Sequence, residues 1–374
     1  MKIAVNTRLL IKNKLDGIGW FTFETLKRIT YQHPEHEFIF LFDRKFSDEF
    51  IFSSNVKPIV LFPQARHPFL YYWWFQFSVA GILKKEKPGL FLSPDGFLPL
   101  SKWPRFLPVI HDLNFEKYPG DLPFLTSKYY RHFFPKFART ATRIATVSEF
   151  SKQDIVHRYN ILPEKIDVVY NGSNEKYLPL SEPEQLKTRI RISEGKPYFV
   201  FIGTLHPRKN ISRLFMAFDE FRKSKISDVK LVIIGSKMWW TSEMESAFEN
   251  MKFGDEVIFT GRLEPGDLAR VAASALAMVY VSTFEGFGIP ILESFYCDVP
   301  VITSNVTSMP EVAGEAALLV NPFSVDSIKD SMNKIYSDKL LRDDLINKGK
   351  VQRKKFNWQS TADKLWKSIE KTME

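Results

Sequence analysis

One stretch of this 374-residue chain, residues 277–304, constrains its fold more than any other. The apolar runs at 277–281 and 299–303 have the length and composition of buried strands. Between them lies a loop with two glycines, and Pro290 then suits the first position of a helix. Glycines let a ligand approach the backbone, and a helix start presents N–H groups and a positive dipole end. The stretch therefore predicts an α/β sheet whose loop binds an anionic, diphosphate-bearing ligand.

Two carboxylates flank this loop, Glu285 inside it and Glu293 eight residues later in the helix. A carboxylate beside a phosphate would repel it, so these groups are better suited to accept hydrogen bonds from hydroxyls. A ligand with both a diphosphate and many hydroxyls is a nucleotide sugar. An arbitrary pair of surface glutamates is the alternative, and the strand–loop–helix setting argues against it.

The segment resembles the E-x7-E signature of the family 4 retaining glycosyltransferases (glycosyl transferases group 1). The resemblance implies a GT-B fold, in which two doubly wound Rossmann-like domains face a central cleft. It implies that Glu293 binds the ribose hydroxyls, and that Glu285 holds the donor sugar together with backbone N–H groups of the loop. The donor-binding residues expected here are Glu285, Gly286, Phe287, Gly288, Ile289 and Glu293.

Length and composition suit a protein with two domains. A hydrophobic content of 44% excludes a disordered chain, and the single cysteine, Cys297, excludes a disulfide framework or a cysteine-ligated zinc site. The chain contains no run of about 20 apolar residues, so its sequence does not predict a membrane-spanning helix. The strand that starts at Lys2 leaves no room for a signal peptide, so we expect a cytoplasmic protein.

The net charge of +9 belongs mostly to the amino-terminal half. Lys and Arg outnumber Asp and Glu by 24 to 16 through Tyr170, and by 28 to 27 after it. Such a surface would attract an anionic membrane or an anionic acceptor. It favours peripheral contact with the inner face of the plasma membrane. No nucleic-acid motif accompanies it, so nucleic acid is not an expected partner.

The first expected domain, residues 1–172, contains strands at 2–6, 37–42, 58–62, 90–93, 106–110, 143–147 and 166–170. The aromatic run 69–77 reads as a buried amphipathic helix, with exposure at a bilayer surface as the alternative. After the first strand comes a Gly17-x-Gly19 loop, where such folds bring ligands to the backbone; a simple tight turn is the alternative. In the resembling family this loop faces the acceptor and the donor phosphates, which makes Gly17 an acceptor residue and Gly19 a donor residue.

Polar residues follow two further strands of this domain. His111 and Asp112 come directly after the strand 106–110, at the edge where α/β sheets place ligands. In the family such a histidine contacts the reacting sugar, so we expect His111 to be catalytic and His111 and Asp112 to bind the acceptor. Ser148 is expected to cap a helix, and Glu149 to line the acceptor side of the cleft.

The second expected domain, residues 173–355, starts with a strand at 198–202 and continues with strands at 230–234, 256–260, 277–281, 299–303 and 317–320. Its first strand ends in Gly203 and is followed by Arg208 and Lys209, with Asn210 as an expected helix cap. Two cations at a helix start suit a diphosphate, although a solvated turn is the alternative. The segment resembles the family's G-x(5)-RKN motif, with Thr204 where many members carry a phosphate-binding arginine; this gives more weight to Arg208 and Lys209. Arg262, after the strand 256–260, is either a donor contact or a surface charge.

The terminal segment 356–374 reads as a helix that crosses back to the first domain, as in GT-B proteins. The resemblance implies transfer of a sugar from a nucleotide diphosphate sugar to a glycan or lipid-linked acceptor, with retained anomeric configuration, in cell-surface polysaccharide synthesis. Glu285, Arg208 and Lys209 join His111 as catalytic residues. No metal or other cofactor is expected, because the two cations and the helix start supply the positive charge. GDP-mannose is the favoured donor, followed by UDP-sugars.

Three other functions compete with this interpretation. A catalytically silent nucleotide-sugar-binding protein would keep the same site without turnover. A nucleotide-sugar epimerase or a phosphorylase would share the fold, but the GFG–Pro–Glu element and the lack of a cofactor-lysine context disfavour them. A dehydrogenase is disfavoured by the missing third glycine of the dinucleotide fingerprint.

Overall fold

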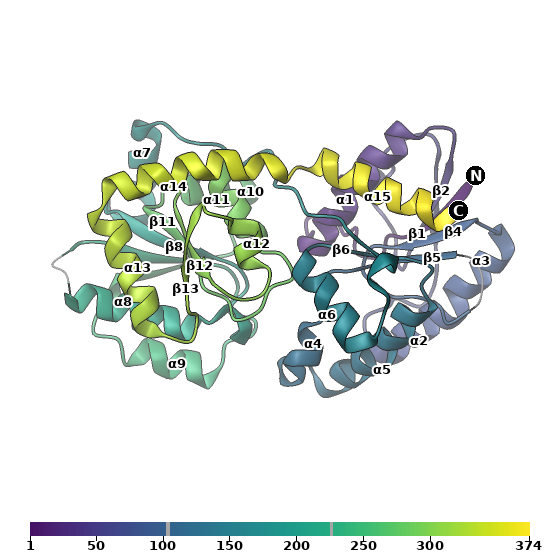
Figure 1. Ribbon diagram of the computed structural model, residues 1–374, viewed down its shortest axis with the longest axis horizontal. Coiled ribbons are helices and arrows are strands. Elements are labelled where there is room, and N and C mark those ends of the chain that lie inside the picture. Colours follow the sequence, from purple (N-terminus) through teal and green to yellow (C-terminus); the bar gives the residue numbers. More distant parts are fainter. Residues whose placement is uncertain (102–104, 225–226) are drawn as a thin grey trace. The chain divides into compact units, whose positions relative to one another are not determined.

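The computed structural model describes residues 1–101, 105–224 and 227–374, and the chain forms two compact units (Figure 1). Unit 1 comprises Met1–Gly172 together with Asn357–Glu374, and unit 2 comprises Ser173–Phe356. Phe356 therefore ends unit 2 and does not open the terminal segment. Its ring packs edge-on against Phe287 of the same unit, with the ring centroids 5.6 Å apart.

Unit 1 is built on a sheet whose described strands all pair in parallel, in the order β3-β2-β1-β4-β5-β6-β7. The order reverses beside β1, which pairs with β2 on one side and β4 on the other. This is the doubly wound arrangement that the sequence predicted, and it places the ligand edge at the carboxyl ends of the strands. The strands are β1 (Lys2–Asn6), β2 (Glu37–Phe42), β3 (Val56–Val60), β4 (Leu90–Ser93), β5 (Arg105–Ile110), β6 (Ile144–Thr146) and β7 (Ile166–Val168).

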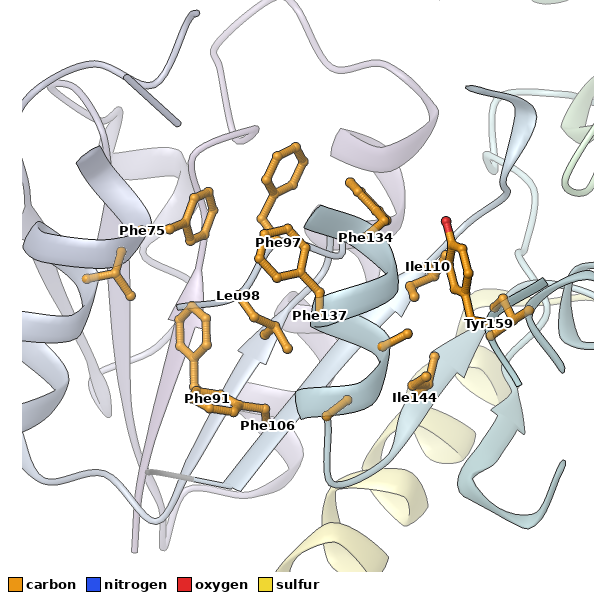
Figure 2. Close-up of a cluster of buried hydrophobic side chains, with 14 of the residues drawn as sticks. Phe75, Phe91, Phe97, Leu98, Phe106, Ile110, Phe134, Phe137, Ile144 and Tyr159 are labelled. Atoms are coloured by element: carbon orange, nitrogen blue, oxygen red, sulfur yellow. The ribbon is translucent and has the colours of Figure 1, made fainter. Parts of the chain in front are cut away.

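Helices cover the sheet of unit 1 and bury an unusually aromatic core (Figure 2). Phe91 and Phe106 on the strands and Phe137 on α5 are fully buried, and Phe75 stacks on Phe97 with 5.3 Å between ring centroids. The helical segments are α1 (Gly17–Gln32), η1 (Asp48–Phe50), α2 (Pro68–Trp73), the π-helical η2 (Trp74–Val79), α3 (Ala80–Glu86), α4 (Asn114–Lys117), η3 (Pro119–Asp121), α5 (Phe124–Thr140), α6 (Glu149–Tyr159), η4 (Pro163–Lys165) and α15 (Trp358–Met373).

Two sequence-based expectations for unit 1 need correction. The strand expected at 58–62 is β3, Val56–Val60, whose Pro58 is tolerated because β3 lies at the edge of the sheet. The aromatic run 69–77 is helical, but it is not a buried helix. Trp74 and Phe75 face the core, while Phe69, Trp73 and Phe77 are exposed.

Unit 2 carries a second sheet of parallel strands, in the order β10-β9-β8-β11-β12-β13 over the described residues. Its order reverses beside β8, so β8 and β11 are neighbours at the switch point. The strands are β8 (Tyr198–Ile202), β9 (Lys230–Ile234), β10 (Val257–Gly261), β11 (Ala277–Tyr280), β12 (Val301–Ser304) and β13 (Ala317–Val320). The helical segments are α7 (Glu182–Ser193), η5 (Pro207–Lys209), α8 (Ile211–Ser224), α9 (Ser242–Glu249), η6 (Gly254–Glu256), α10 (Pro265–Ala273), α11 (Ile289–Tyr296), α12 (Met309–Ala313), α13 (Val325–Ser337), α14 (Lys339–Gln352) and η7 (Arg353–Lys355).

The terminal helix α15 is part of unit 1. Thr361 donates a hydrogen bond to the carbonyl of Tyr170 at 2.7 Å, and the indole of Trp366 stacks on His33 with 3.5 Å between ring centroids. Within the described ranges no helix combines the length and the hydropathy that crossing a bilayer requires.

Candidate functional site

The candidate site of unit 2 lies where two neighbouring strands end. The segment after β8 carries Arg208 and Lys209, and the loop after β11 carries Glu285. Because β8 and β11 pair in parallel, these segments leave the sheet at the same edge. The backbone joins them directly, since the N–H of Thr283 donates to the carbonyl of Arg208 at 2.8 Å.

Arg208, Lys209 and Glu285 form one hydrogen-bonded cluster. Nη1 of Arg208 donates to Oε2 of Glu285 at 2.7 Å, and Nζ of Lys209 donates to Oε1 at 2.6 Å. Glu285 and Lys209 are buried. Burial alone would raise the pKa of Glu285, but the charges of Arg208 and Lys209 outweigh it and lower that pKa to about 2. Glu285 is therefore a carboxylate at neutral pH, with two cations held against it.

Tyr280 is a second partner of Lys209. Its phenol oxygen accepts a hydrogen bond from Nζ of Lys209, and that nitrogen lies 4.7 Å from the ring centroid. Burial raises the pKa of Tyr280, and the negative charge of Glu285 raises it further. The phenol thus stays protonated and fixes the direction of the lysine side chain.

Hydroxyl groups of a third segment hold the Glu285 loop in place. Oγ of Ser308 donates to the carbonyls of Glu285 and Phe287, at 2.9 and 3.0 Å, and the N–H of Glu285 donates to Oγ1 of Thr307 at 3.3 Å. Gly288 has φ +102° and precedes α11, where a Cβ would also lie 3.1 Å from the side chain of Ile291. The loop therefore has little freedom to rearrange.

Two local expectations are wrong in detail. Helix α11 begins at Ile289, so Pro290 occupies its second position. Asn210 is not a side-chain cap that accepts from backbone N–H groups. It has φ +61°, and its side-chain amide donates to the carbonyls of Val281 and Pro322 at 3.0 and 2.7 Å. Asn210 instead ties the cation-bearing turn to the loop after β11.

Glu293 lies on α11 and makes a different contact. Its carboxyl group is hydrogen-bonded to the phenol of Tyr177, which is buried in the same unit. Burial raises the pKa of Glu293 to about 7, although the bond from Tyr177 opposes this shift. The structure describes no bond between Glu293 and the Arg208–Glu285–Lys209 cluster, so the two glutamates of the spacing motif have separate partners.

The remaining donor-binding candidates of unit 2 flank these groups. Gly203 directly follows β8, and Thr204 after it is exposed. Gly286 and Phe287 belong to the loop that Ser308 holds, and Arg262 is exposed directly after β10. Their positions do not test a role in donor binding, so each of these assignments stays a prediction.

The candidates of unit 1 gather at the end of β5. Nε2 of His111 lies 2.8 Å from the carbonyl of Pro94, and its ring packs edge-on against Phe21 of α1. Because a carbonyl only accepts, the proton of the neutral imidazole is on Nε2 and Nδ1 is an acceptor. Desolvation lowers the pKa of His111, so the neutral form prevails at pH 7.

Asp112 directly follows this histidine, and Glu149 begins a helix that is hydrogen-bonded to the histidine backbone. Oδ1 of Asp112 accepts from the N–H of Asn114 at 3.0 Å, which shapes the loop before α4. Glu149 is the first residue of α6, whose cap is Ser148 as predicted, at 3.0 Å from the N–H of Ser151. Ser151 in turn donates to the carbonyl of His111 at 3.0 Å, which fastens α6 to the strand end.

Gly17 and Gly19 do not form a loop, contrary to expectation. Both lie in the first turn of α1, which begins at Gly17 and is capped by Asp16. The side chain of Asp16 accepts from the N–H of Gly19 at 2.9 Å. A Cβ on Gly19 would lie 3.2 Å from the carbonyl oxygen of Leu9, so the glycine serves close packing at a helix start. The sequence signal for this helix start was Asp16, because aspartate is a preferred N-cap residue.

Sequence reasoning missed three residues that shape the unit 2 site: Tyr177, Tyr280 and Ser308. Tyr280 sits in an apolar strand and Tyr177 in the polar connection, so neither carries a local functional pattern. No three or more His, Cys, Asp or Glu side chains come together as a metal-binding group anywhere in the described ranges.

Two family models match the chain. The model described as Glycosyltransferase Family 4 matches residues 16–176, and the model described as Glycosyl transferases group 1 matches residues 183–352. The boundary between the matches falls in the connection that opens unit 2.

Curated relatives and a solved structure agree with these matches. The chain is 29% identical over 372 residues to O-antigen chain mannosyltransferase B of Escherichia coli, which covers 96% of this chain and 97% of that protein. It is 26% identical to O-antigen chain mannosyltransferase RfbU of Salmonella typhimurium, over 76% of this chain and 72% of that protein. The structure of Anabaena HepE in complex with UDP and glucose superposes with a TM-score of 0.76, at 14% identity and with 99% of each chain covered.

The two parallel sheets and the family matches over most of its length thus lead to one conclusion: this chain belongs to the group 1 (family 4) glycosyltransferases and has the GT-B fold.

Proposed function

We propose that this glycosyltransferase moves mannose from GDP-mannose to a hydroxyl of a glycan or lipid-linked acceptor, in the synthesis of a cell-surface polysaccharide. Two relatives named as O-antigen chain mannosyltransferases support the sugar and the pathway class. We further propose that transfer retains the anomeric configuration and needs no metal ion.

The observation that carries the proposal is the Arg208–Glu285–Lys209 cluster at the carboxyl edge of β8 and β11. Breaking the bond between sugar and nucleotide leaves a diphosphate that gains negative charge. Positioned cations stabilise such a leaving group most effectively in a buried site, and Lys209 is buried. The start of α11 adds its N–H groups to the same charge stabilisation.

Glu285 has a second role in this proposal. A carboxylate offers about four lone-pair sites. Arg208 and Lys209 each occupy one of its oxygens, and the phenol of Tyr280 makes a further hydrogen bond to it. The remaining capacity suits the hydroxyls of the donor sugar. Glu285 therefore links the groups that hold the diphosphate to the sugar that departs from it, while Glu293 accepts from the ribose hydroxyls.

In unit 1, His111 is assigned to the reacting sugar. Its neutral imidazole keeps Nδ1 as an acceptor, because Nε2 donates to Pro94. Gly17, Asp112 and Glu149 stay the proposed acceptor residues, and Gly19 the proposed unit 1 contact of the donor. For retention we propose front-face attack, in which the leaving phosphate accepts the proton of the acceptor hydroxyl.

The test is a transfer assay with purified protein, GDP-mannose and an oligosaccharide or lipid-linked acceptor, with UDP-glucose as the competing donor. We expect a mannoside whose anomeric configuration by NMR equals that of the donor, and equal rates with and without EDTA. Inversion would refute the mechanism, and loss of activity in EDTA would refute metal independence. GDP-mannose that is bound but neither transferred nor hydrolysed would favour the silent binding protein.

The proposal also places the protein in peripheral contact with the inner face of the plasma membrane. The support is the excess of basic residues in the amino-terminal half.

A further inference from the structure

An exposed aromatic surface covers the helical segment α2–η2 of unit 1. Phe69, Trp73 and Phe77 are 72%, 56% and 54% exposed, and Leu70 and Tyr72 are exposed beside them. Their spacing of four residues puts Phe69, Trp73 and Phe77 along one side of the helical segment, opposite the buried Trp74 and Phe75. The side turned to solvent is thus aromatic where a surface helix of a monomer is ordinarily polar.

The rings of Tyr72, Trp73 and Phe77 are in contact with one another, and the contacts extend to the neighbouring helix α5. The rings of Trp73 and Phe77 lie 5.0 Å apart, and Tyr72 lies 6.1 Å from Phe77 and 5.7 Å from Phe133 of α5. Figure 1 shows α2 and α5 side by side in unit 1. Isolated surface aromatics need no explanation, but a contiguous group of this kind marks a binding surface.

The helices that carry or adjoin this aromatic patch also carry exposed cations, and residues 62–85 and 123–140 of these segments lack acidic side chains. Nζ of Lys136 lies 5.3 Å from the centroid of Phe133, and Lys128 and Arg139 are exposed on the same helix. Lys84 and Lys85 are exposed on α3, which continues α2–η2. The charge of Arg131 is partly balanced by Glu116, whose Oε2 lies 3.6 Å from Nε of Arg131.

We propose that this surface, the aromatic patch of α2–η2 with the cations of α3 and α5, docks on an anionic lipid bilayer. Indole and phenol rings favour the interface between headgroups and acyl chains, where their apolar bodies are buried and their polar groups stay hydrated. Lysine and arginine beside them reach the lipid phosphates, and the long stems of these side chains pack over the apolar region.

The charge favours a membrane over a second copy of the chain. If two copies met through this surface, the cations of one copy would face those of the other. Like charges across an interface oppose association. A negatively charged bilayer offers both the opposite charge and an apolar layer for the rings. This inference deepens the proposed function, because it identifies how the enzyme would reach a lipid-linked acceptor.

Sedimentation with lipid vesicles tests docking without donor or acceptor. Full-length protein is mixed with vesicles of phosphatidylcholine alone, or with phosphatidylglycerol added at 30%, roughly the anionic content of a charged leaflet. We expect binding to the anionic vesicles that is at least tenfold tighter than to the neutral ones, and weaker binding as salt is raised. Equal binding to both vesicles, or none to either, overturns the proposal.

Paired substitutions test whether this surface is responsible. Trp73→Ser with Phe77→Ser should reduce binding to anionic vesicles at least tenfold. Tyr31→Ser with Leu340→Ser, which removes two even more exposed apolar groups elsewhere, should not reduce it. Lys128→Gln with Lys136→Gln should reduce it by roughly fivefold for each cation. Lys334→Gln with Lys354→Gln, a charge-matched pair in unit 2, should leave it unchanged.

Further measurements on the same variants separate the explanations. Thermal melting shows whether Trp73→Ser with Phe77→Ser still folds, and the lysine pair provides a test that leaves the rings intact. Transfer to a water-soluble acceptor should be unchanged in both pairs, so failure of docking and failure of the proposed reaction give different results. Undiminished vesicle binding in both pairs overturns the proposal. So does a dimer, measured by analytical ultracentrifugation, that dissociates on losing Trp73 and Phe77 while no variant binds vesicles.

Discussion

At the residue scale, the site of unit 2 is organised by the sharing of one carboxylate. Glu285 balances the charges of Arg208 and Lys209 at once, and the phenol of Tyr280 accepts a second hydrogen bond from the lysine. An unpaired charge in such a buried place would be costly, so each member keeps the others ionised. The cluster is consequently both a structural unit and the group proposed to stabilise the leaving diphosphate.

Glu285→Gln separates these two roles. The amide keeps the shape but releases Arg208 and Lys209 from their counter-charge, so we expect GDP to bind at least as tightly as in the wild type. Transfer should fall by about 100-fold or more, because the acceptor for the sugar hydroxyls is weakened. Calorimetry with GDP and the mannose transfer rate measure the two effects. Glu315→Gln, at an exposed position of the same unit, is the control, and weaker GDP binding in Glu285→Gln would contradict this assignment.

Lys209→Ala should weaken transfer strongly while it destabilises the fold little. Arg208 remains against Glu285 in this variant, so the carboxylate keeps one partner. We expect donor affinity and transfer each to fall by at least tenfold, with a melting temperature close to that of the wild type. Lys209→Arg tests whether charge alone suffices. Full activity in Lys209→Ala would contradict the assignment of Lys209 to the leaving diphosphate.

Glu293 links the site to stability and pH. Its pKa is raised from 4.5 to about 7, chiefly by burial. Between these pH values the unfolded chain has lost this proton while the folded protein retains it. The free energy of unfolding therefore falls as pH rises from 4.5 to 7, and the whole loss persists above pH 7. Glu293→Gln should thus raise the free energy of unfolding at pH 8 by up to about 3 kcal/mol and leave it unchanged near pH 4.5.

The same variant should bind the donor at least tenfold more weakly, because the amide replaces a charged acceptor of ribose hydroxyls. Denaturation with urea at pH 4.5 and pH 8, together with donor titration, measures both changes. Tyr177→Phe, which removes the partner of Glu293 but keeps the ring, should shift the pH dependence of donor binding upward. A stability difference that does not vary with pH would argue against a buried, titrating Glu293.

At the scale of elements, the segments that follow β8 and β9 approach each other closely at Gly203 and Gly235. Gly235 follows β9, and a Cβ there would lie 1.8 Å from the carbonyl oxygen of Gly203, which follows β8. No side-chain rotation relieves a contact between a Cβ and backbone. The two strand ends can therefore come together only because Gly235 has no side chain, and the Gly203 segment leads to Arg208 and Lys209.

Gly235→Ala should destabilise unit 2 by more than about 3 kcal/mol, since backbone must move to admit the methyl group. Gly266→Ala is the matched control. Gly266 lies in α10 with open space around its Cβ position, so alanine there should be neutral or stabilise the protein by about 0.5–1 kcal/mol. Unfolding by urea followed by tryptophan fluorescence compares the variants. Equal stability of the two would show that the strand ends separate easily.

At the scale of the whole molecule, the chain closes unit 1 with its last helix. Trp358, Leu365 and Ile369 of α15 are buried, and a Cβ on Gly172 would lie 2.5 Å from the backbone nitrogen of Trp358. Each such fully buried side chain contributes about 1.5–3 kcal/mol, and a domain is stable by only about 5–15 kcal/mol in total. Unit 1 therefore depends on a segment that is separated from its remainder by all of unit 2.

Deletion of residues 357–374 should unfold unit 1 and leave unit 2 folded, because its sheet and the Arg208–Glu285–Lys209 cluster lie within 173–356. We expect the truncated protein to lose transfer while GDP still raises the melting temperature of the remaining transition. Hydrogen exchange, read unit by unit, checks the outcome. Protected amides in β1 and β4 after truncation would contradict it.

The sequence by itself located the strands along the chain, and for several of them also their bounds. Runs of apolar residues predicted β1, β2, β8 and β9 with their bounds unchanged, because a strand buried on both faces needs such a run whatever surrounds it. The same local physics placed Glu285, Arg208 and Lys209 after strands, and the spacing of motif residues led to the right family. Local signals also misled where two were in competition, since Gly17 and Gly19 suggested a loop although Asp16 caps a helix at that point.

Tertiary structure alone decided which groups share a partner and which faces are covered. Lys209 and Tyr280 are 71 residues apart and meet because β8 and β11 are neighbours in the sheet, which no local pattern states. The aromatic run 69–77 is polar only at Gln76, so periodicity could not tell which of its rings would be buried. Burial depends on what packs against each ring, and that is settled by contacts between segments distant in the chain: the core takes Trp74 and Phe75, and Phe69, Trp73 and Phe77 stay exposed.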